Sequence, residues 1–155
     1  MRPDAGAILL RAMHADDVEW VMKLAADLRE TPRWPTSVWQ QIVNGQGVQR
    51  IARVAEFDGR RAGFAVAGVV ADGAELESIA VVELWHGRGI GRRLMEVVLA
   101  ACFEAGACRI TLEVRRSNLA AQALYRAMGF CFAGTRTAYY NDPVEDALLM
   151  ERGLP

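Results

Sequence analysis

A glycine-rich turn between an apolar run and an amphipathic segment constrains this chain more than any other feature. Residues 86–91 read His-Gly-Arg-Gly-Ile-Gly, and the apolar run Ile79–Val82 precedes them. After the turn, apolar side chains recur at helical spacing at Ile90, Leu94, Val97, Val98 and Ala101. The pattern predicts a strand, a tight turn and a helix. The first turn of such a helix has unpaired backbone N–H groups and the positive end of its dipole, and both favour a bound anion.

The composition of the turn suits a diphosphate. Glycines let phosphate oxygens approach the backbone without Cβ clashes, and arginines add positive charge. The turn contains both kinds of residue: the glycines Gly87, Gly89 and Gly91 and the arginines Arg88, Arg92 and Arg93. A dinucleotide fingerprint would need the spacing Gly-x-Gly-x-x-Gly, and a P-loop would need Gly-Lys-Ser/Thr, so the spacing matches neither. A turn without a ligand is the remaining alternative.

Length and composition favour one packed domain, residues 1–155. The chain is 52% hydrophobic and 24% charged, and its net charge of −1 gives no global basic field for nucleic acid. Apolar runs stay well short of the roughly 18 residues of a membrane span, and the N-terminus does not read as a secretory leader, so we expect a cytoplasmic protein. Cys102, Cys108 and Cys131 lie in apolar segments, which predicts reduced, buried thiols. The scattered His and Cys residues predict no metal site.

Periodicity and turn residues predict the order of elements. Asp58-Gly59 is a strong hairpin signal, Asn118 is a helix cap, and Gly106 and Gly129 are helix stops. The pattern therefore predicts an α/β (α+β) protein with a mixed, mostly antiparallel sheet. Strands are expected over residues 8–12, 48–57, 61–70, 74–82, 109–114, 131–140 and 144–151, and helices over about 16–28, 36–43, 90–105 and 118–128.

Three further segments carry side chains suited to chemistry. Residues 112–118 read Leu-Glu-Val-Arg-Arg-Ser-Asn, and residues 123–130 follow with Ala-Leu-Tyr-Arg-Ala-Met-Gly-Phe. The last segment, residues 139–150, reads Tyr-Tyr-Asn-Asp-Pro-Val-Glu-Asp-Ala-Leu-Leu-Met. A carboxylate such as Glu113 can take a proton from an amine, and a phenol such as Tyr125 can give one to a leaving thiolate.

Together, these motifs resemble the GNAT superfamily of N-acetyltransferases, and especially its branch of ribosomal-protein alanine N-acetyltransferases. The resemblance covers nearly the whole chain and implies the GNAT fold, with about seven strands, about four helices and a sheet that splays at the acetyl-CoA site. It implies that acetyl-CoA is the cosubstrate, with its diphosphate on the glycine turn and its pantetheine along the strand before it. His86 departs from the Gln or Arg usual at its position. The implied cofactor-binding residues are Ile79, Ala80, Val81, Arg88, Gly89, Ile90, Gly91, Arg92, Asn118 and Tyr125.

The resemblance also implies roles in catalysis. Glu113 would be the general base, Tyr125 the general acid, and Tyr139 and Tyr140 would lie beside the entering peptide. Each position has a simpler structural interpretation: Glu113 could pair with Arg115 or Arg109, Tyr125 could be a core aromatic, and the tyrosine pair could cover the sheet. Glu75 and Glu77 are alternative bases, because other branches of the superfamily carry the base on the strand before the glycine turn.

The implied activity is transfer of acetyl to a protein N-terminal amine in a ternary complex, with the N-terminal alanine of ribosomal protein S18 as the leading substrate. An α-amine (pKa about 8) loses its proton more readily than a lysine (about 10.4). Acetylation of a small amine, or an acetyl-CoA sensor without turnover, are the alternatives. The expected partner is a peptide N-terminus rather than nucleic acid or membrane, and the expected assembly is a monomer or weak dimer.

Overall fold

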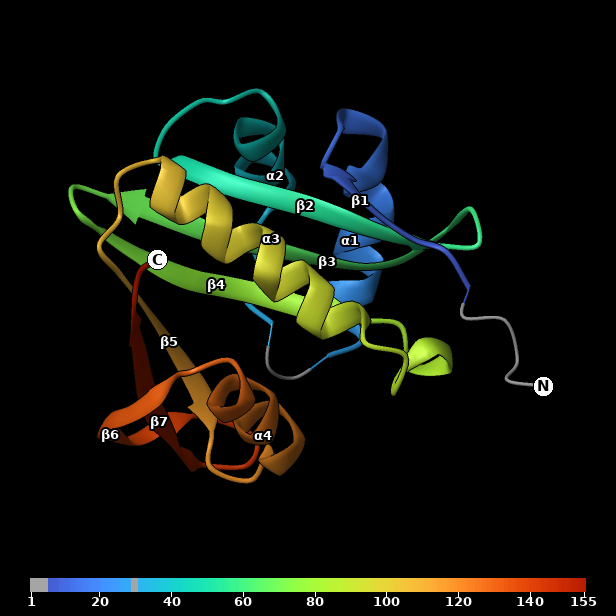
Figure 1. Ribbon diagram of the computed structural model, residues 1–155. Helices are drawn as coiled ribbons and strands as arrows, with labels where there is room; N and C mark the ends of the chain where they lie inside the picture. The colour runs from blue at the N-terminus through green and yellow to red at the C-terminus, as the bar shows by residue number, and fades with distance from the viewer. Residues whose placement is uncertain (1–5, 29–30) are drawn as a thin grey trace.

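The computed structural model describes residues 6–28 and 31–155, and a split seven-stranded sheet organises them. Figure 1 shows α3 and α4 on one face of the sheet and α1 and α2 on the other. The strand order is β1-β2-β3-β4-β5-β7-β6. The strands are β1 (Ile8–Ala12), β2 (Gln49–Phe57), β3 (Arg60–Val70), β4 (Gly73–Val81), β5 (Arg109–Arg115), β6 (Cys131–Tyr140) and β7 (Glu145–Gly153). The helices are α1 (Val18–Ala26), α2 (Thr36–Val43), α3 (Ile90–Glu104) and α4 (Leu119–Ala127), with short 3₁₀ helices η1 (Ala15–Asp17) and η2 (Glu83–Trp85).

The sheet separates between β4 and β5, the only neighbouring strands in it that run parallel. Their pairing is limited to Gly73 with Arg109, Ala74 with Ile110 and Glu75 with Thr111. Beyond these residues the two strands diverge, so the sheet is splayed as expected.

Local sequence signals account for the turns that build this sheet. The β2–β3 hairpin closes at Asp58 and Gly59, whose φ angles of 50° and 78° are the positive values that a two-residue hairpin turn needs. Asn118 caps α4 by accepting a hydrogen bond from the Ala121 N–H at 3.1 Å. Gly129, at φ 90°, directly follows the C-cap Met128.

Two apolar cores lie on opposite faces of the sheet. Beneath α3 and α4, the helical stripe of Ile90, Leu94 and Val98 packs with alternate residues of β5, such as Ile110 and Leu112. Beneath α1 and α2, the core contains Val21, Trp39, Phe64, Val66 and Ala80. The indole of Trp39 meets the ring of Phe64 edge-on at 5.8 Å between centroids. One face of β4 and β5 therefore packs toward α3 and α4, and the other face lies on the side of α1 and α2.

The prediction that all three cysteines are buried is wrong for two of them. Cys102 is buried within α3, while Cys108 and Cys131 are exposed. Cys108 lies just before β5 begins, and Cys131 opens the edge strand β6, along which most side chains are exposed. An apolar neighbourhood in the sequence therefore did not mean burial at a turn or on an edge strand.

Asp17 holds the start of α1 against the sheet. Its carboxylate is buried, with an exposed fraction of 1%, and it accepts hydrogen bonds from Arg11 at 2.7 Å, Arg61 at 2.8 Å and the His14 N–H at 2.7 Å. The Arg11 hydrogen bond and the further bonds from His14 and Arg61 hold the pKa of Asp17 well below its usual range, against the opposing effect of burial. Arg11 and Arg61 belong to β1 and β3, so one carboxylate ties three elements together.

Asp17→Asn is expected to lower the free energy of unfolding by about 2–3 kcal/mol. This is less than for breaking a fully buried pair, because both guanidinium groups keep some water. Since the folded-state pKa of Asp17 is lowered, its contribution is present above pH about 4 and is lost as the pH falls through the folded value. Urea unfolding at pH 7 and at pH 3 measures both effects, with the exposed neighbour in Asp16→Asn as control. Equal stability of the two variants at pH 7 would contradict the assignment.

Candidate active site

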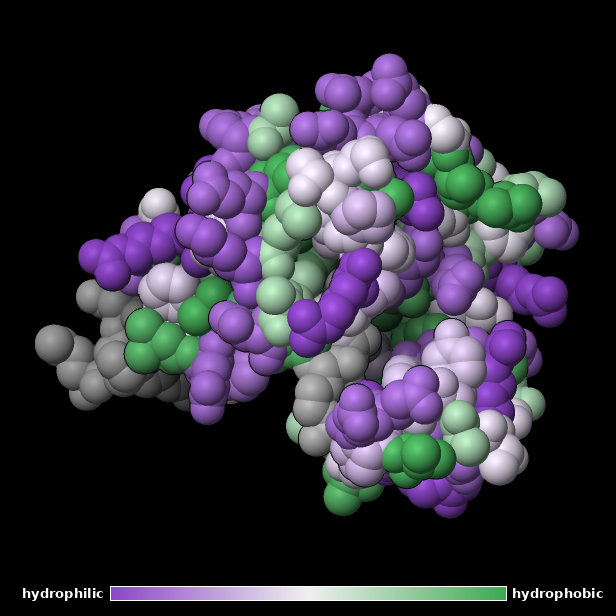
Figure 2. Space-filling view, turned by 180° about the vertical axis from the view of Figure 1, so that it is seen from behind, coloured by the Kyte–Doolittle hydropathy of each residue, from purple (hydrophilic) through white to green (hydrophobic). Residues whose placement is uncertain are grey.

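An apolar-lined hollow lies in the split between β4 and β5. Figure 2 shows the molecule hollowed between the part that carries α1 and α2 and the part that carries α4. The cavity has a volume of about 570 Å³ and is walled by β4, the glycine turn, the start of α3, β5 and α4. The predicted site residues that line it are Ile79, Ala80, Val81, Gly89, Ile90, Gly91, Arg92, Glu113, Asn118 and Tyr125. Residues from both halves of the sheet thus meet at one place.

The glycine turn has the backbone geometry of an anion-binding helix start. Gly87 and Gly89 have φ angles of 77° and 79°, and Gly89 is the N-cap of α3. A Cβ at either position would meet no described atom within 4 Å, so the space in front of the turn is open. Gly91 lies close to α4, with its hypothetical Cβ 3.5 Å from Leu124 Cδ2. The first N–H groups of α3 therefore border a space that can take a diphosphate.

The side chains of this turn contact different parts of the protein. Arg92 lines the cavity and its Nε bonds Glu96 at 3.3 Å. Arg88 does not line it; the guanidinium lies over the ring of Phe57, 5.2 Å from the centroid. His86 Nε2 donates to the Val81 carbonyl at 2.8 Å. The residue that departs from the usual Gln or Arg thus ties the turn to the end of β4.

Gly89→Ala is expected to weaken acetyl-CoA binding about five- to tenfold. An alanine at this left-handed position costs about 1–2 kcal/mol, which the turn would relieve by changing the direction of its N–H groups. Gly106→Ala is the matched control: Gly106 has φ 98°, no described atom near its hypothetical Cβ, and a place at the other end of α3. Calorimetric titration of acetyl-CoA into both variants measures the effect. A similar loss of affinity in the control would show that strain alone was responsible.

Glu113 is a half-sheltered carboxylate in the cavity wall. Its Oε1 lies 2.7 Å from Arg136 Nε, and its side chain is 15% exposed. Glu113 does form an ion pair, but the prediction that its partner is Arg115 or Arg109 is wrong. The partner is Arg136 of β6. The hydroxyl of Tyr139 donates to the Glu113 carboxylate, and this hydrogen bond is the main reason why the pKa of Tyr139 is raised. Tyr139 consequently stays protonated at neutral pH and keeps donating to Glu113.

The two competing carboxylates on β4 are placed differently. Glu77 lines the cavity but forms an ion pair with Arg50 at 2.9 Å. Glu75 is not part of the cavity wall, and removal from water, followed by the charges of Glu77 and Glu113, raises its pKa. Of the three, Glu113 alone both lines the cavity and belongs to β5.

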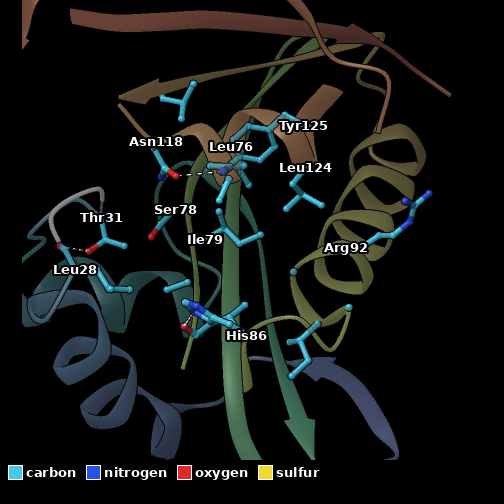
Figure 3. Close-up of a pocket in the computed structure, with 18 of the residues that line it drawn as sticks. Leu28, Thr31, Leu76, Ser78, Ile79, His86, Arg92, Asn118, Leu124 and Tyr125 are labelled. Carbon is cyan, nitrogen blue, oxygen red and sulfur yellow. Dashed lines mark hydrogen bonds between the residues drawn. The ribbon is translucent and has the colours of Figure 1, made fainter. Parts of the chain in front are cut away.

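Tyr125 and Asn118 approach the cavity from α4 (Figure 3). Tyr125 is 6% exposed, and its ring packs 5.8 Å from that of Phe130 between centroids, so it is a core aromatic as well as a wall residue. Asn118 is a helix cap and a wall residue at once. Gln122, which the sequence reasoning passed over, anchors the same helix by donating to the carbonyls of Arg115 and Arg116 at 3.1 and 2.8 Å.

Tyr139 and Tyr140 lie outside the described cavity wall, beside it on the β6–β7 hairpin. Their rings meet edge-on at 5.1 Å, and Tyr139 reaches the wall through its hydrogen bond to Glu113. Tyr140 lies under the guanidinium of Arg115 at 4.3 Å.

Arg115, at the end of β5, holds the β6–β7 hairpin through several hydrogen bonds. The sequence suggested it only as a partner of Glu113. Arg115 is 3% exposed and donates to Glu145 Oε1 at 3.3 Å and to the Asn141 and Pro143 carbonyls. Glu145 also accepts from the Ser117 N–H at 2.7 Å. The end of β5 is thereby joined to the hairpin that carries the two tyrosines.

One group of potential metal ligands forms within residues 6–28 and 31–155, at His14, Asp16 and Asp17. Asp17 is already bound by Arg11 and Arg61, and none of the three lines the cavity. Nor do the described residues include a helix long and apolar enough to cross a membrane.

The split sheet and the glycine turn at the start of α3 give the chain the architecture of an acyltransferase of the GNAT type. Residues 17–130 match the acetyltransferase (GNAT) family, and the chain belongs to that family. GNAT enzymes use acetyl-CoA, and the open glycine turn of this chain fits that cosubstrate.

Named relatives support the assignment. A Bacillus subtilis protein, provisionally named a ribosomal protein bS18-alanine N-acetyltransferase, is 33% identical over 91% of this chain and 92% of its own length. The Escherichia coli ribosomal protein bS18-alanine N-acetyltransferase is 42% identical over 60% of this chain and 64% of its own. The crystal structure of the ribosomal-protein-S18-alanine N-acetyltransferase from Escherichia coli superimposes with a TM-score of 0.82 and 30% identity, covering 96% of this chain and 94% of that one.

Proposed function

We propose that this N-acetyltransferase transfers the acetyl group of acetyl-CoA to the α-amine of a protein N-terminus, with the N-terminal alanine of ribosomal protein S18 as the first candidate. Two relatives named for that activity support the proposal, and each matches over nine-tenths of both chains. The observation that carries it furthest is Glu113, a carboxylate in the cavity wall that also receives the Tyr139 hydroxyl from the neighbouring hairpin.

In this proposal each wall residue has a chemical task. The N–H groups at the start of α3 bind the diphosphate, and the free edge of β4 at Ile79–Val81 holds the pantetheine and polarises the thioester carbonyl. Glu113, directly or through water, takes the proton that the acceptor ammonium must lose before it attacks. Tyr125 donates a proton to the departing thiolate. The C–N bond forms first and gives a tetrahedral oxyanion, which collapses as the C–S bond breaks, with no covalent enzyme intermediate.

Chemistry favours an α-amine over a lysine in this site. An α-amino group titrates near pH 8 and a lysine near 10.4, so a lysine needs roughly two more pKa units of assistance. Glu113 is engaged by Arg136 and by the Tyr139 hydroxyl, and both contacts hold the carboxylate at the cavity wall. Tyr139 and Tyr140 are proposed to border the path of the entering peptide.

A paired-peptide assay tests the proposal. Thiol release from acetyl-CoA is followed with a peptide that begins with a free alanine, and with the same sequence blocked at its N-terminus and carrying one internal lysine. Release with the free N-terminus alone is expected. Release with neither peptide, but with a small polyamine, would favour the small-amine alternative, which the cluster of Glu75, Glu77 and Glu113 would suit. Acetyl-CoA binding without any turnover would favour a sensor.

A further inference from the structure

Ser78 is a buried hydroxyl in the cavity wall that the chemistry above does not use. The side chain is 5% exposed, and its Oγ finds no hydrogen-bond partner among residues 6–28 and 31–155. Figure 3 shows Ser78 pointing away from β4 into the pocket. Buried polar groups are nearly always hydrogen-bonded, and one left unpaired costs free energy of folding. A hydroxyl that is unpaired in the free protein and faces a ligand cavity suggests a bond made to a ligand.

A β-bulge sets the direction of this hydroxyl. Val66 of β3 pairs with Ser78, but the next residue, Ala67, pairs with Leu76, so Glu77 is an extra residue on β4. Val66 and Ala80 belong to the core beneath α1 and α2. Ser78 lies opposite Val66 and two residues before Ala80, so its side chain shares their face of the sheet. It therefore faces the α1–α2 side.

The neighbours of Ser78 on β4 face the opposite way. Ile79 and Val81 pack against the core beneath α3 and α4, the side of the glycine turn. Ser78 thus comes immediately before the stretch Ile79–Val81 that is proposed to polarise the thioester, but its side chain lies on the other face.

Glu113 shares the face of Ser78. Leu112 and Val114, on either side of it in β5, are buried in the core beneath α3 and α4, so Glu113 alternates to the α1–α2 side. The split between the strands is consequently lined on this face by a hydroxyl from β4 and a carboxylate from β5, and both belong to the same cavity. An acceptor entering from this face meets both groups next to the acetyl-bearing end of the site.

We propose that Ser78 Oγ binds the acceptor α-amine by accepting a hydrogen bond from one of its N–H groups, while Glu113 receives the proton that the ammonium gives up. This inference rests on the proposed function. A serine hydroxyl can accept as well as donate, and a deprotonated primary amine still has two N–H bonds, so one remains for Ser78. The bond fixes the direction of the nitrogen lone pair toward the thioester carbon.

Ser78→Ala tests the inference. With the full chain, acetyl-CoA and a peptide that begins with alanine, the variant is expected to lose roughly three- to tenfold in kcat/KM, the value of one neutral hydrogen bond. The dissociation constant for acetyl-CoA, measured by calorimetry without peptide, should stay unchanged. The melting temperature should equal or exceed that of the wild type, because an unpaired buried hydroxyl is removed. Ser37→Ala, at an exposed position of α2 outside the cavity wall, is the matched control.

The other outcomes separate the two proposals. An unchanged kcat/KM in Ser78→Ala, with an active wild type, would overturn the role of Ser78 and leave the proposed function standing. A parallel loss of acetyl-CoA affinity would overturn it too, since the hydroxyl would then serve the cosubstrate. A wild type that fails to acetylate the peptide while it acetylates a small amine would overturn both.

Discussion

Glu113→Gln is expected to lower kcat/KM for an alanine-starting peptide by about 10²- to 10⁴-fold, the range for loss of a general base. Glutamine keeps the size of the side chain and can still receive the Tyr139 hydroxyl, but it cannot take a proton at neutral pH. The freed Arg136 is 59% exposed and can be hydrated, so the folded state should lose no more than about 1 kcal/mol. Steady-state kinetics, together with calorimetry of acetyl-CoA binding, separates catalysis from cosubstrate affinity.

Glu75→Gln is the matched control for this prediction. Glu75 lies on β4 outside the cavity wall, yet it is close enough for its pKa to respond to the charge of Glu113. Its loss is expected to change kcat/KM less than about tenfold. The reverse pattern, with Glu75→Gln inactive and Glu113→Gln close to wild type, would place the base on β4 instead.

Tyr125→Phe is expected to lower kcat by about 10²-fold or more, because the departing thiolate would lose its proton donor. Phenylalanine preserves the ring that packs against Phe130, and the melting temperature should therefore move little. Acetyl-CoA titration reports whether binding is intact, and single-turnover kinetics reports the chemical step. A variant that turns over within about twofold of wild type would reduce Tyr125 to its packing role.

Much of the fold could be predicted because local signals and periodicity agreed. The bounds of β6 are as expected, the Asp58-Gly59 turn closes the β2–β3 hairpin, and Asn118 caps α4. Leu112 in the core and Glu113 in the cavity wall lie on opposite faces of β5, as the period of two along a strand requires. These features depend on residues near one another in the sequence, where turn chemistry and the period of two or 3.6 decide the outcome.

The partners of the site residues depended on tertiary structure and could not be predicted. Glu113 pairs with Arg136 because the strand order places β7 between β5 and β6, and only a long side chain spans that distance. Sequence spacing instead suggested Arg109 or Arg115. The direction of Ser78 depends on a bulge that shifts register by one residue, and nothing in the local sequence marks it.

The glycine turn shows, within a few residues, what could be predicted from the sequence and what could not. Its backbone course followed from the glycines, but the composition gave no means of distinguishing its arginines. Arg92 lines the cavity, whereas Arg88 lies over Phe57, a residue from a strand far away in the sequence. Likewise, Asp17 is bound by Arg61 of β3, a contact beyond any local pattern.

A single competition experiment tests the central claim most directly. One peptide, with a free N-terminal alanine and an internal lysine, is incubated with the enzyme and acetyl-CoA, and the modified nitrogen is located by fragment-ion mass spectrometry. The proposed function predicts acetyl on the α-amine and an unmodified lysine. Acetyl on the lysine, with the α-amine left free, would contradict it.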